Sequence, residues 1–391
     1  MFLAGCSADT TGPAGNTAGT TAQGQAGTAN SAGNTGTGGT SSTAGTTGAS
    51  GSASNGGTSA TAGSGGGTAA GAGGMSGGSS GGSGGSGGGG SATRSAGCGM
   101  DPGGTDSQAM WVKHDIEVPD VDPAFVAKYA VNAGKTYNWT HRNYFMRLPT
   151  NYDQNRAYPI VIGGSGCGGS DTVGSEGGYS PLGTGAGETE AIQVSLSYVL
   201  SSAANADCGG AVFADGFVNT PEQQYLAAVV KDVQSKNCTD TKKVFLGGYS
   251  SGAFEAITLG CANSDILRGY GVQIGGGLRL DHPACKGPVA AMFVVGLQDN
   301  DNPIGPLAQP KNNSLGSAPA RDELLTRNGC TGSEHKPWDA DYPDCEIYTG
   351  CPAQYPVVWC AIQSGHLPDA KDPAVGKYRY EGLWKFWSTL P

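Results

Sequence analysis

The chain has 391 residues, a formal net charge of −10, 70 glycines and 11 cysteines. Acidic residues outnumber basic ones and no run of Lys or Arg occurs, which argues against the electrostatic footprint of a nucleic-acid-binding protein. No apolar stretch approaches the length of a transmembrane helix, so we expect neither a nucleic-acid partner nor a membrane span.

The first part of the chain, residues 1–97, differs sharply in composition from the rest. Between Ser7 and Gly97 it consists almost entirely of Gly, Ser, Thr, Ala and Asn, and it contains no aromatic residue, Leu, Ile or Val. Such a segment cannot bury enough apolar surface to offset the entropy lost on ordering. We therefore predict a disordered tether within 1–97 and a single folded α/β domain over 98–391.

The N-terminus contains the sequence Leu-Ala-Gly-Cys, which resembles a bacterial lipobox whose cysteine, here Cys6, becomes lipidated. The charged and apolar regions of a signal peptide do not precede it, so we interpret these residues as a truncated signal remnant, with a coincidence of small residues as the alternative. A lipid anchor followed by a long tether suits a surface lipoprotein. We expect an extracellular protein that is tethered to the outer membrane through Cys6 or secreted.

Ten cysteines remain when Cys6 is set aside. An even number of cysteines spread through one domain is typical of a disulfide-bonded exported protein. A zinc site is the competing interpretation, but no Cys-x-x-Cys pair and no histidine pair with ligand spacing occurs, so we predict neither a metal nor a cofactor. Spacing does not determine the connectivity, although the short loop between Cys345 and Cys351 predicts one local disulfide.

Apolar and alternating runs predict a series of strands. They are Trp111–Val118, Arg142–Leu148, Tyr158–Ile162, Ile192–Val199, Val244–Leu246, Tyr270–Ile274, Val289–Leu297 and Val357–Ile362. Helices are predicted to begin at Thr220–Pro221 and Ser251, and a closing helix is predicted over Tyr380–Leu390. Alternating strands and helices predict a mostly parallel sheet with helices on both faces. The Pro-, Asn- and Asp-rich segment Pro303–Pro356 is predicted to be an irregular insertion near the functional site.

The predicted strand at Val244 ends in Gly248-Tyr-Ser-Ser-Gly252, and a predicted helix follows. Strand, Gly-x-Ser-x-Gly and helix together form the nucleophile elbow of serine hydrolases. The turn is so tight that a side chain two residues before or after Ser250 would collide with the neighbouring chain. Ser250 is therefore the predicted nucleophile, although a Gly-rich turn without function is the alternative in so Gly-rich a chain. Its neighbour Tyr249 is expected to be a packing residue.

A serine nucleophile needs a base and an acid that orients the base. In the chain order of the α/β-hydrolases, the acid follows Ser250 and the histidine comes last. Asp299 ends a buried strand and is the predicted acid, with Asp301 as the near alternative. Of the two histidines that follow, His335 lies in the irregular insertion, whereas His366 follows the last strand after a short loop. His366 is therefore the predicted base.

The oxyanion hole needs two backbone N–H donors. One is predicted to be the N–H of Ser251, at the positive end of the helix that follows the nucleophile. The other is predicted to be the N–H of Cys167, in the glycine-rich loop after the third strand. A phosphate-binding Rossmann turn is the alternative for this loop, but its spacing does not fit Gly-x-Gly-x-x-Gly before a helix.

With these residues identified, the chain from Cys98 onward resembles the esterase family that contains bacterial feruloyl esterases and polyhydroxybutyrate depolymerases. The resemblance implies an α/β-hydrolase fold and serine esterase activity. Ser165 stands where that family usually has the histidine of a His-Gly dipeptide. The motifs that carry the resemblance are Asn143-Tyr-Phe-Met-Arg-Leu-Pro-Thr-Asn-Tyr152, Tyr158-Pro-Ile-Val-Ile162, Gly166-Cys-Gly-Gly-Ser170, Gly248-Tyr-Ser-Ser-Gly252, Gly296-Leu-Gln-Asp-Asn-Asp-Asn-Pro-Ile304 and Gly365-His366.

The resemblance leads us to expect an exported serine esterase that acts on an ester substrate, on plant polysaccharide or on polyester. We favour a feruloyl esterase that releases hydroxycinnamate from xylan fragments, and we expect it to be a monomer. A polyhydroxybutyrate depolymerase and an acetyl xylan esterase are the alternatives. Tannase-type feruloyl esterases tie serine to histidine through flanking cysteines, but Tyr249 and Leu367 occupy those positions here. A non-catalytic surface binding protein is the alternative from another class, and the complete set of Ser, Asp and His argues against it.

Overall fold

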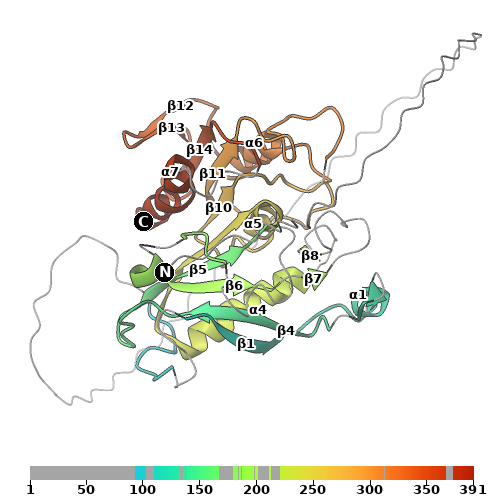
Figure 1. The fold of residues 1–391 in the computed structure, drawn as a ribbon, viewed down its shortest axis with the longest axis vertical. Coiled ribbons are helices and arrows are strands. Elements are labelled where there is room, and N and C mark those ends of the chain that lie inside the picture. The colour runs from blue at the N-terminus through green and yellow to red at the C-terminus, as the bar shows by residue number, and fades with distance from the viewer. Residues whose placement is uncertain are drawn as a thin grey trace, which may run out of the picture. The chain divides into compact units, whose positions relative to one another are not determined.

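The fold is organised around one large sheet. Its strands are β1 (Val112–Glu117), β4 (His141–Arg147), β5 (Tyr158–Gly164), β6 (Ile192–Leu196), β9 (Thr239–Tyr249), β10 (Gly269–Gln273), β11 (Ala290–Gly296), β12 (His335–Asp339), β13 (Tyr342–Tyr348) and β14 (Val357–Ile362). Within the described part of the chain these form a ten-stranded sheet in the order β1-β4-β6-β5-β9-β10-β11-β14-β13-β12. Figure 1 shows β1 at one end of this sheet and the β12–β13 hairpin at the other.

The computed structural model describes residues 93–102, 110–129, 131–132, 135–136, 138–166, 179–183, 185, 187–197, 199–200, 211–212, 221–311, 313–366 and 373–391. All of them fall in one compact unit, Ser83–Pro391. The lipobox residue Cys6 and most of the predicted tether lie outside the described residues. The last residues of the predicted tether contact the domain, because the Ser95 N–H donates to the Thr239 carbonyl at 3.0 Å.

The middle of the sheet is parallel. Strands β6, β5, β9, β10, β11 and β14 pair in parallel, whereas β4 is antiparallel to both of its neighbours. Every residue of β10 and β11 is buried, as expected for parallel strands that are covered on both faces. The predicted α/β class is confirmed, and this strand order, with one antiparallel strand next to the first, is that of an α/β-hydrolase.

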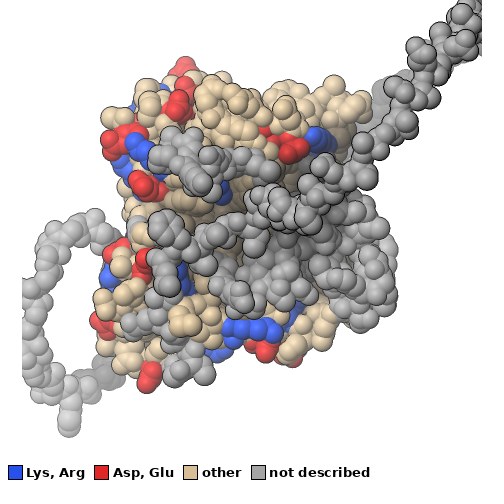
Figure 2. All heavy atoms as spheres, viewed as in Figure 1, with Lys and Arg blue, Asp and Glu red and all other residues tan. Residues whose placement is uncertain are grey.

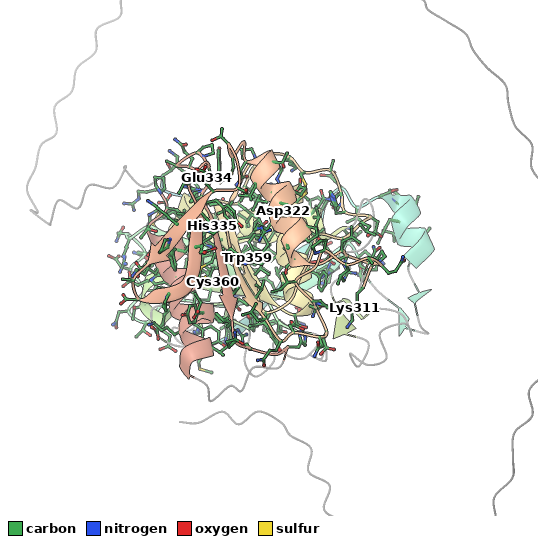
Figure 3. The ribbon with its side chains drawn as sticks, turned by 90° about the horizontal axis from the view of Figure 1, so that it is seen from above. Lys311, Asp322, Glu334, His335, Trp359 and Cys360 are labelled. Atoms are coloured by element: carbon green, nitrogen blue, oxygen red, sulfur yellow. A yellow bond between two sulfur atoms is a disulfide. The ribbon has the colours of Figure 1, made fainter. Side chains whose placement is uncertain are left out.

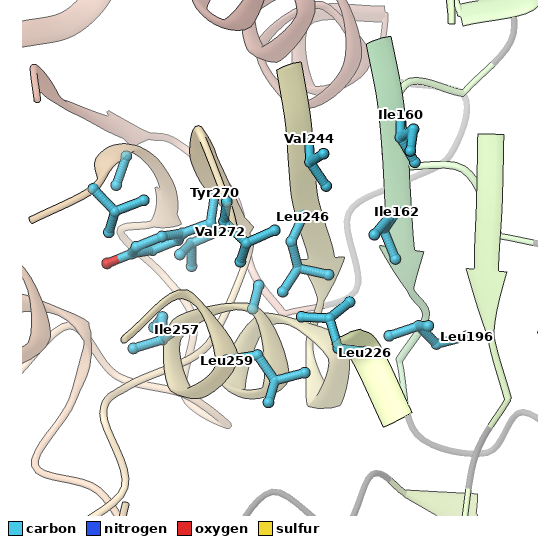
Figure 4. Close-up of a cluster of buried hydrophobic side chains, with 14 of the residues drawn as sticks. Ile160, Ile162, Leu196, Leu226, Val244, Leu246, Ile257, Leu259, Tyr270 and Val272 are labelled. Atoms are coloured by element: carbon cyan, nitrogen blue, oxygen red, sulfur yellow. The ribbon is translucent and has the colours of Figure 1, made fainter. Parts of the chain in front are cut away.

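Helices α4 (Pro221–Lys236) and α5 (Ser251–Ala262) cover one face of the sheet. Figure 4 shows Leu226 of α4 and Ile257 of α5 below strand side chains such as Ile162 and Leu246. These side chains belong to one continuous buried cluster. Burial of each large apolar side chain stabilises the fold by about 1.5–3 kcal/mol, so this packing holds the start of α5 against the end of β9.

The opposite face is covered by the C-terminal helices. Successive residues of a strand point to opposite faces, so Phe245 lies on the face opposite Leu246. Phe245 packs with Trp387, with 5.2 Å between ring centroids. Trp387 belongs to α8 (Leu383–Ser388), which follows the π-helix η2 (Lys377–Gly382). The remaining elements are α1 (Pro123–Tyr129), β2 (Val131–Asn132), β3 (Lys135–Thr136), α3 (Gly187–Glu190), β7 (Val199–Leu200), β8 (Ala211–Val212), α6 (Ser317–Arg327) and α7 (Pro373–Gly376).

The segment Pro303–Pro356 is irregular only in part, so the prediction that it is an irregular insertion is wrong for the rest of it. It contains the helix α6 and the hairpin β12–β13, which extends the sheet because β13 pairs with β14. The edge strand β12 is largely exposed and reads His-Lys-Pro-Trp-Asp, so it lacks the apolar alternation that reveals a half-buried strand. Proline is tolerated there because an edge strand leaves one side without a ladder partner.

Three other predicted elements differ in their bounds by three or more residues. The strand predicted over Val244–Leu246 is longer and runs over Thr239–Tyr249. The strand predicted over Ile192–Val199 ends at Leu196, and the separate short strand β7 begins at Val199. The closing helix predicted over Tyr380–Leu390 begins earlier, as the π-helix at Lys377. An amphipathic pattern identifies a helical segment, but it does not distinguish the wider π-helical turn from an α-helical one.

Eight cysteines pair within the described residues. The disulfides are Cys98–Cys238, Cys261–Cys285, Cys330–Cys351 and Cys345–Cys360. The predicted Cys345–Cys351 pair is therefore wrong. Cys345 lies directly opposite Cys360 in the β13–β14 register, so a strand pairing that the sequence does not reveal determines its partner. Cys167 and Cys208 lie outside the described residues.

On the described residues of the face in view, basic and acidic side chains are interspersed (Figure 2). Among the described helices, none has both the length and the apolar character needed to cross a membrane.

Opening the long-range disulfide should destabilise the domain more than opening the short-range one. Cys98–Cys238 spans 140 residues and Cys345–Cys360 spans 15. Loss of loop-closure entropy in the unfolded chain predicts costs of about 5 and about 3 kcal/mol, respectively. Denaturant unfolding of the two double-alanine variants measures this difference. A larger loss of stability in the Cys345–Cys360 variant than in the Cys98–Cys238 variant would contradict this prediction.

Candidate active site

The turn between β9 and α5 holds Ser250 in a strained backbone conformation. Its φ is 55° and its ψ is −113°, a region that residues other than glycine seldom adopt and that costs about 1–3 kcal/mol. The Ser250 N–H points toward the carbonyl of Ile274 at 3.1 Å, which anchors the turn to the end of β10. Ser250 is only 7% exposed, and its side chain stands at the carboxyl edge of the sheet.

Gly248 and Gly252 allow the turn to close. A Cβ on Gly248 would lie 2.0 Å from the carbonyl oxygen of Gly252, and a Cβ on Gly252 would lie 1.9 Å from that of Gly164. Both distances are far below any real carbon–oxygen contact, and the obstructing atoms belong to the backbone. The steric reason for the glycines of the predicted elbow is therefore confirmed.

The structure brings the predicted nucleophile, base and acid together in one hydrogen-bonded chain. Ser250 Oγ lies 2.9 Å from His366 Nε2, and His366 Nδ1 lies 3.0 Å from Asp299 Oδ2. The side chains of Asp299 and His366 are 1% and 14% exposed, so bulk water has little access to their contact. The second carboxylate oxygen of Asp299 accepts the N–H groups of Asp301 (2.9 Å) and Asn302 (2.7 Å), which fixes the orientation of the carboxylate.

The arrangement fits proton transfer from a serine hydroxyl. The imidazole is within hydrogen-bond distance of the hydroxyl on one side and of the carboxylate on the other, as a general base with an orienting acid requires. Asp301, the alternative acid, contributes its backbone N–H to Asp299 and is itself exposed. His335, labelled in Figure 3, lies on β12, the strand at one edge of the sheet, and it pairs with Glu346 at 3.0 Å.

Of the two predicted oxyanion donors, Ser251 lies among the described residues and Cys167 does not. Ser251 is the first residue of α5, so its N–H belongs to the free donors at the positive end of a 12-residue helix. The loop that precedes Cys167 does approach the elbow, because a Cβ on Gly166 would lie 3.2 Å from the Cβ of Ser250.

Three residues near the site were not identified from the sequence as functional. Asn302 Nδ2 lies 3.2 Å from His366 Nδ1, Tyr249 contacts the main chain of His366, and Arg379 lies over the Tyr249 ring. The position of Tyr249 next to Ser250 was a usable signal. Arg379 gave none, because its proximity arises from the packing of the C-terminal helix.

A group of potential metal ligands lies apart from the site. Cys261, His282 and Cys285 place ligand atoms within 4.8 Å of one another. The two sulfurs are bonded to each other, and a disulfide sulfur is not the thiolate that zinc binds. His282 Nδ1 is also 2.7 Å from the Pro283 carbonyl oxygen, an acceptor. These residues therefore form a disulfide with a neighbouring histidine and not a zinc-ligand set.

Comparison with known proteins identifies relatives that share most of the domain. The chain is 26% identical over 271 residues to feruloyl esterase D of Neurospora crassa, an alignment that covers 65% of this chain and 83% of the relative. It is 26% identical over 254 residues to a probable feruloyl esterase C of Aspergillus clavatus, with 63% and 83% covered. No protein-family model matches the chain.

Solved structures of esterases are also similar to this chain. A ferulic acid esterase of Anaeromyces mucronatus in complex with ferulic acid has a TM-score of 0.36 and 13% identity, and the alignment covers 69% of this chain and 89% of that one. An acetyl xylan esterase of Aspergillus awamori has a TM-score of 0.40 and 16% identity, with 61% and 93% covered. The fold assignment itself rests on the strand order and the elbow.

A single methyl group at Gly252 should disrupt the elbow. The added carbon of Gly252→Ala would overlap the Gly164 carbonyl, so we expect the variant to lose at least about 1–3 kcal/mol of stability and most of its esterase activity. Gly287→Ala is the matched control, because its Cβ would meet its nearest neighbour, Ser264 Oγ, at an ordinary 3.6 Å. Thermal unfolding and hydrolysis of p-nitrophenyl acetate measure both effects. Wild-type activity in Gly252→Ala would show that the turn is not so tightly closed.

Proposed function

Because the chain is an α/β-hydrolase serine esterase of the feruloyl esterase family, we propose that it releases hydroxycinnamate from feruloylated plant polysaccharide such as xylan. The observation that carries this proposal is the sequence likeness to feruloyl esterases over 83% of their length. The hydrogen-bonded Ser250, His366 and Asp299 support it, because a serine activated in this way attacks acyl carbons, including those of esters.

In the proposed reaction, His366 Nε2 accepts the proton of Ser250 as Oγ attacks the ester carbonyl carbon. Asp299 keeps the imidazole in the tautomer whose Nε2 is free and stabilises the imidazolium that forms. The imidazolium then donates its proton to the departing alcohol oxygen, which leaves an acyl-serine. A water molecule, deprotonated by His366, attacks the acyl carbon and releases the carboxylic acid and the Ser250 hydroxyl.

The negative charge on the carbonyl oxygen needs donors that are already in place. We assign this role to the N–H of Ser251 and, from the sequence, to the N–H of Cys167. The position of Ser251 in the first turn of α5 supports the first assignment, because that end of the helix carries partial positive charge. No metal or cofactor enters the proposed reaction.

We also propose that the protein works outside the cytoplasm. Four disulfides among the described residues suit an oxidising compartment, because cytosolic thiols are kept reduced. Attachment to a membrane through a lipid on Cys6 is the more specific form of this proposal. It rests on the Leu-Ala-Gly-Cys sequence alone.

The nature of the substrate is tested by comparing three esters. Hydrolysis of methyl ferulate should be faster than release of acetate from acetylated xylan, and polyhydroxybutyrate should not be hydrolysed. Ser250→Ala should reduce hydrolysis by at least about 10³-fold, because removal of the nucleophile leaves only binding and oxyanion stabilisation. Preferred hydrolysis of acetylated xylan or polyhydroxybutyrate would replace the proposed substrate with an alternative, and full activity in Ser250→Ala would refute the proposed nucleophile.

The identity of the acid is tested by a pair of amide substitutions. Asp299→Asn should reduce kcat by about 10³–10⁴-fold, because the amide does not stabilise the imidazolium and favours the wrong tautomer. Asp301→Asn is the matched control and should keep kcat within about threefold, because the substitution retains the backbone N–H that Asp301 donates to Asp299. The reverse pattern would make Asp301 the acid.

A further inference from the structure

Tyr249 contacts three segments of the candidate site. It directly precedes Ser250, and its hydroxyl donates a hydrogen bond to the main-chain carbonyl oxygen of His366 at 2.7 Å. Its ring is stacked on the imidazole of His366, with 5.8 Å between centroids and 19° between planes. A Cβ added to Gly166, in the loop that leads toward the predicted oxyanion donor, would lie 3.0 Å from ring carbons of Tyr249.

Arg379 supports the ring of Tyr249. Its guanidinium carbon lies 4.5 Å from the Tyr249 ring centroid, within the range of a cation–π interaction. Arg379 is only 8% exposed, although it carries a charge. It belongs to the π-helix η2, and π-helical turns are rare and often occur at functional sites. The buried side chain of Gln273 donates a hydrogen bond to the Arg379 carbonyl oxygen, which links η2 to the end of β10.

The Tyr249 hydroxyl is suited to act as a donor at neutral pH. Burial raises the pKa of Tyr249 above its ordinary value, and the nearby positive charge of Arg379 offsets this only in part. The hydroxyl therefore keeps its proton over the range in which an imidazole acts as a base. The carbonyl oxygen that accepts it takes no part in proton transfer.

We propose that Tyr249 is a positioning residue that holds His366 against Ser250 and Asp299, and that Arg379 holds Tyr249 in place. This inference rests on the proposed roles of Ser250 and His366. The bonds that the imidazole makes to its reaction partners change as the proton moves and as Ser250 is acylated. The bond from Tyr249 to the main chain persists through both steps, so it can keep the imidazole aligned for deacylation as well as acylation.

The inference is tested with the full chain carrying Tyr249→Phe. This variant keeps the stacked ring and removes the hydrogen bond. We expect kcat for p-nitrophenyl acetate to fall about tenfold with KM within about twofold, because small displacements of a catalytic group lower the rate without weakening substrate binding. A kcat within twofold of the wild type, or a loss confined to KM, would overturn the proposal.

Tyr378→Phe is the matched control. Tyr378 lies on the same π-helix and donates a hydrogen bond from its hydroxyl to Asp344 at 2.6 Å, so the substitution removes a comparable bond away from the site. Its kcat should stay within twofold while its melting temperature falls about as much as that of Tyr249→Phe. An equal loss of kcat in both variants would reduce Tyr249 to a structural residue. In the same assay we expect Ser250→Ala to be inactive. Activity in Ser250→Ala would refute the proposed nucleophile, whereas an unchanged kcat in Tyr249→Phe would refute only the positioning role of Tyr249.

Arg379 provides a second test that does not depend on the folding of Tyr249→Phe. Arg379→Lys keeps the positive charge but loses the flat guanidinium that lies over the ring. We expect kcat to fall about threefold in this variant, with KM unchanged. In Arg379→Gln, which also loses the positive charge, we expect kcat to fall further. An unchanged kcat in both Arg379 variants would overturn the role assigned to Arg379.

Discussion

The close approach of three backbone segments at the end of β9 is the constraint on which the site depends. A Cβ on Gly248 would collide with the backbone of Gly252, a Cβ on Gly252 would collide with the backbone of Gly164, and Ser250 is held at a φ of 55°. A turn this strained persists only because the packing of the surrounding structure outweighs the free-energy cost of its backbone conformation. Here the surroundings are β9, buried between β5 and β10, and α5, whose buried face packs on the same strands.

The rest of the site is placed by neighbouring strands of the same sheet. Asp299 follows β11 and His366 follows β14, and these two strands are adjacent in the sheet and parallel to each other. The carboxyl ends of parallel strands meet at one edge, which is where α/β proteins assemble their sites. The C-terminal helices add a second constraint from the other face, because η2 brings Arg379 to Tyr249 beside the nucleophile.

Features that depend on local sequence could be predicted, and those that depend on distant pairing could not. Strand β14 has the bounds predicted for it, and Asp299 and His366 lie at hydrogen-bond distance as their places after strands suggested. The β12–β13 hairpin was missed because its edge strand carries no apolar alternation. The partner of Cys345 was missed because a strand register sets it, and Arg379 was missed because helix packing brings it to the site.

The central claim is that His366 activates Ser250 as the nucleophile. A fluorophosphonate that reacts with activated serines, followed by peptide mapping, measures this directly. The account predicts one labelled residue, Ser250, and loss of labelling in His366→Ala, because the hydroxyl without a base is a weak nucleophile. Labelling of another serine, or undiminished labelling of Ser250 in His366→Ala, would contradict it.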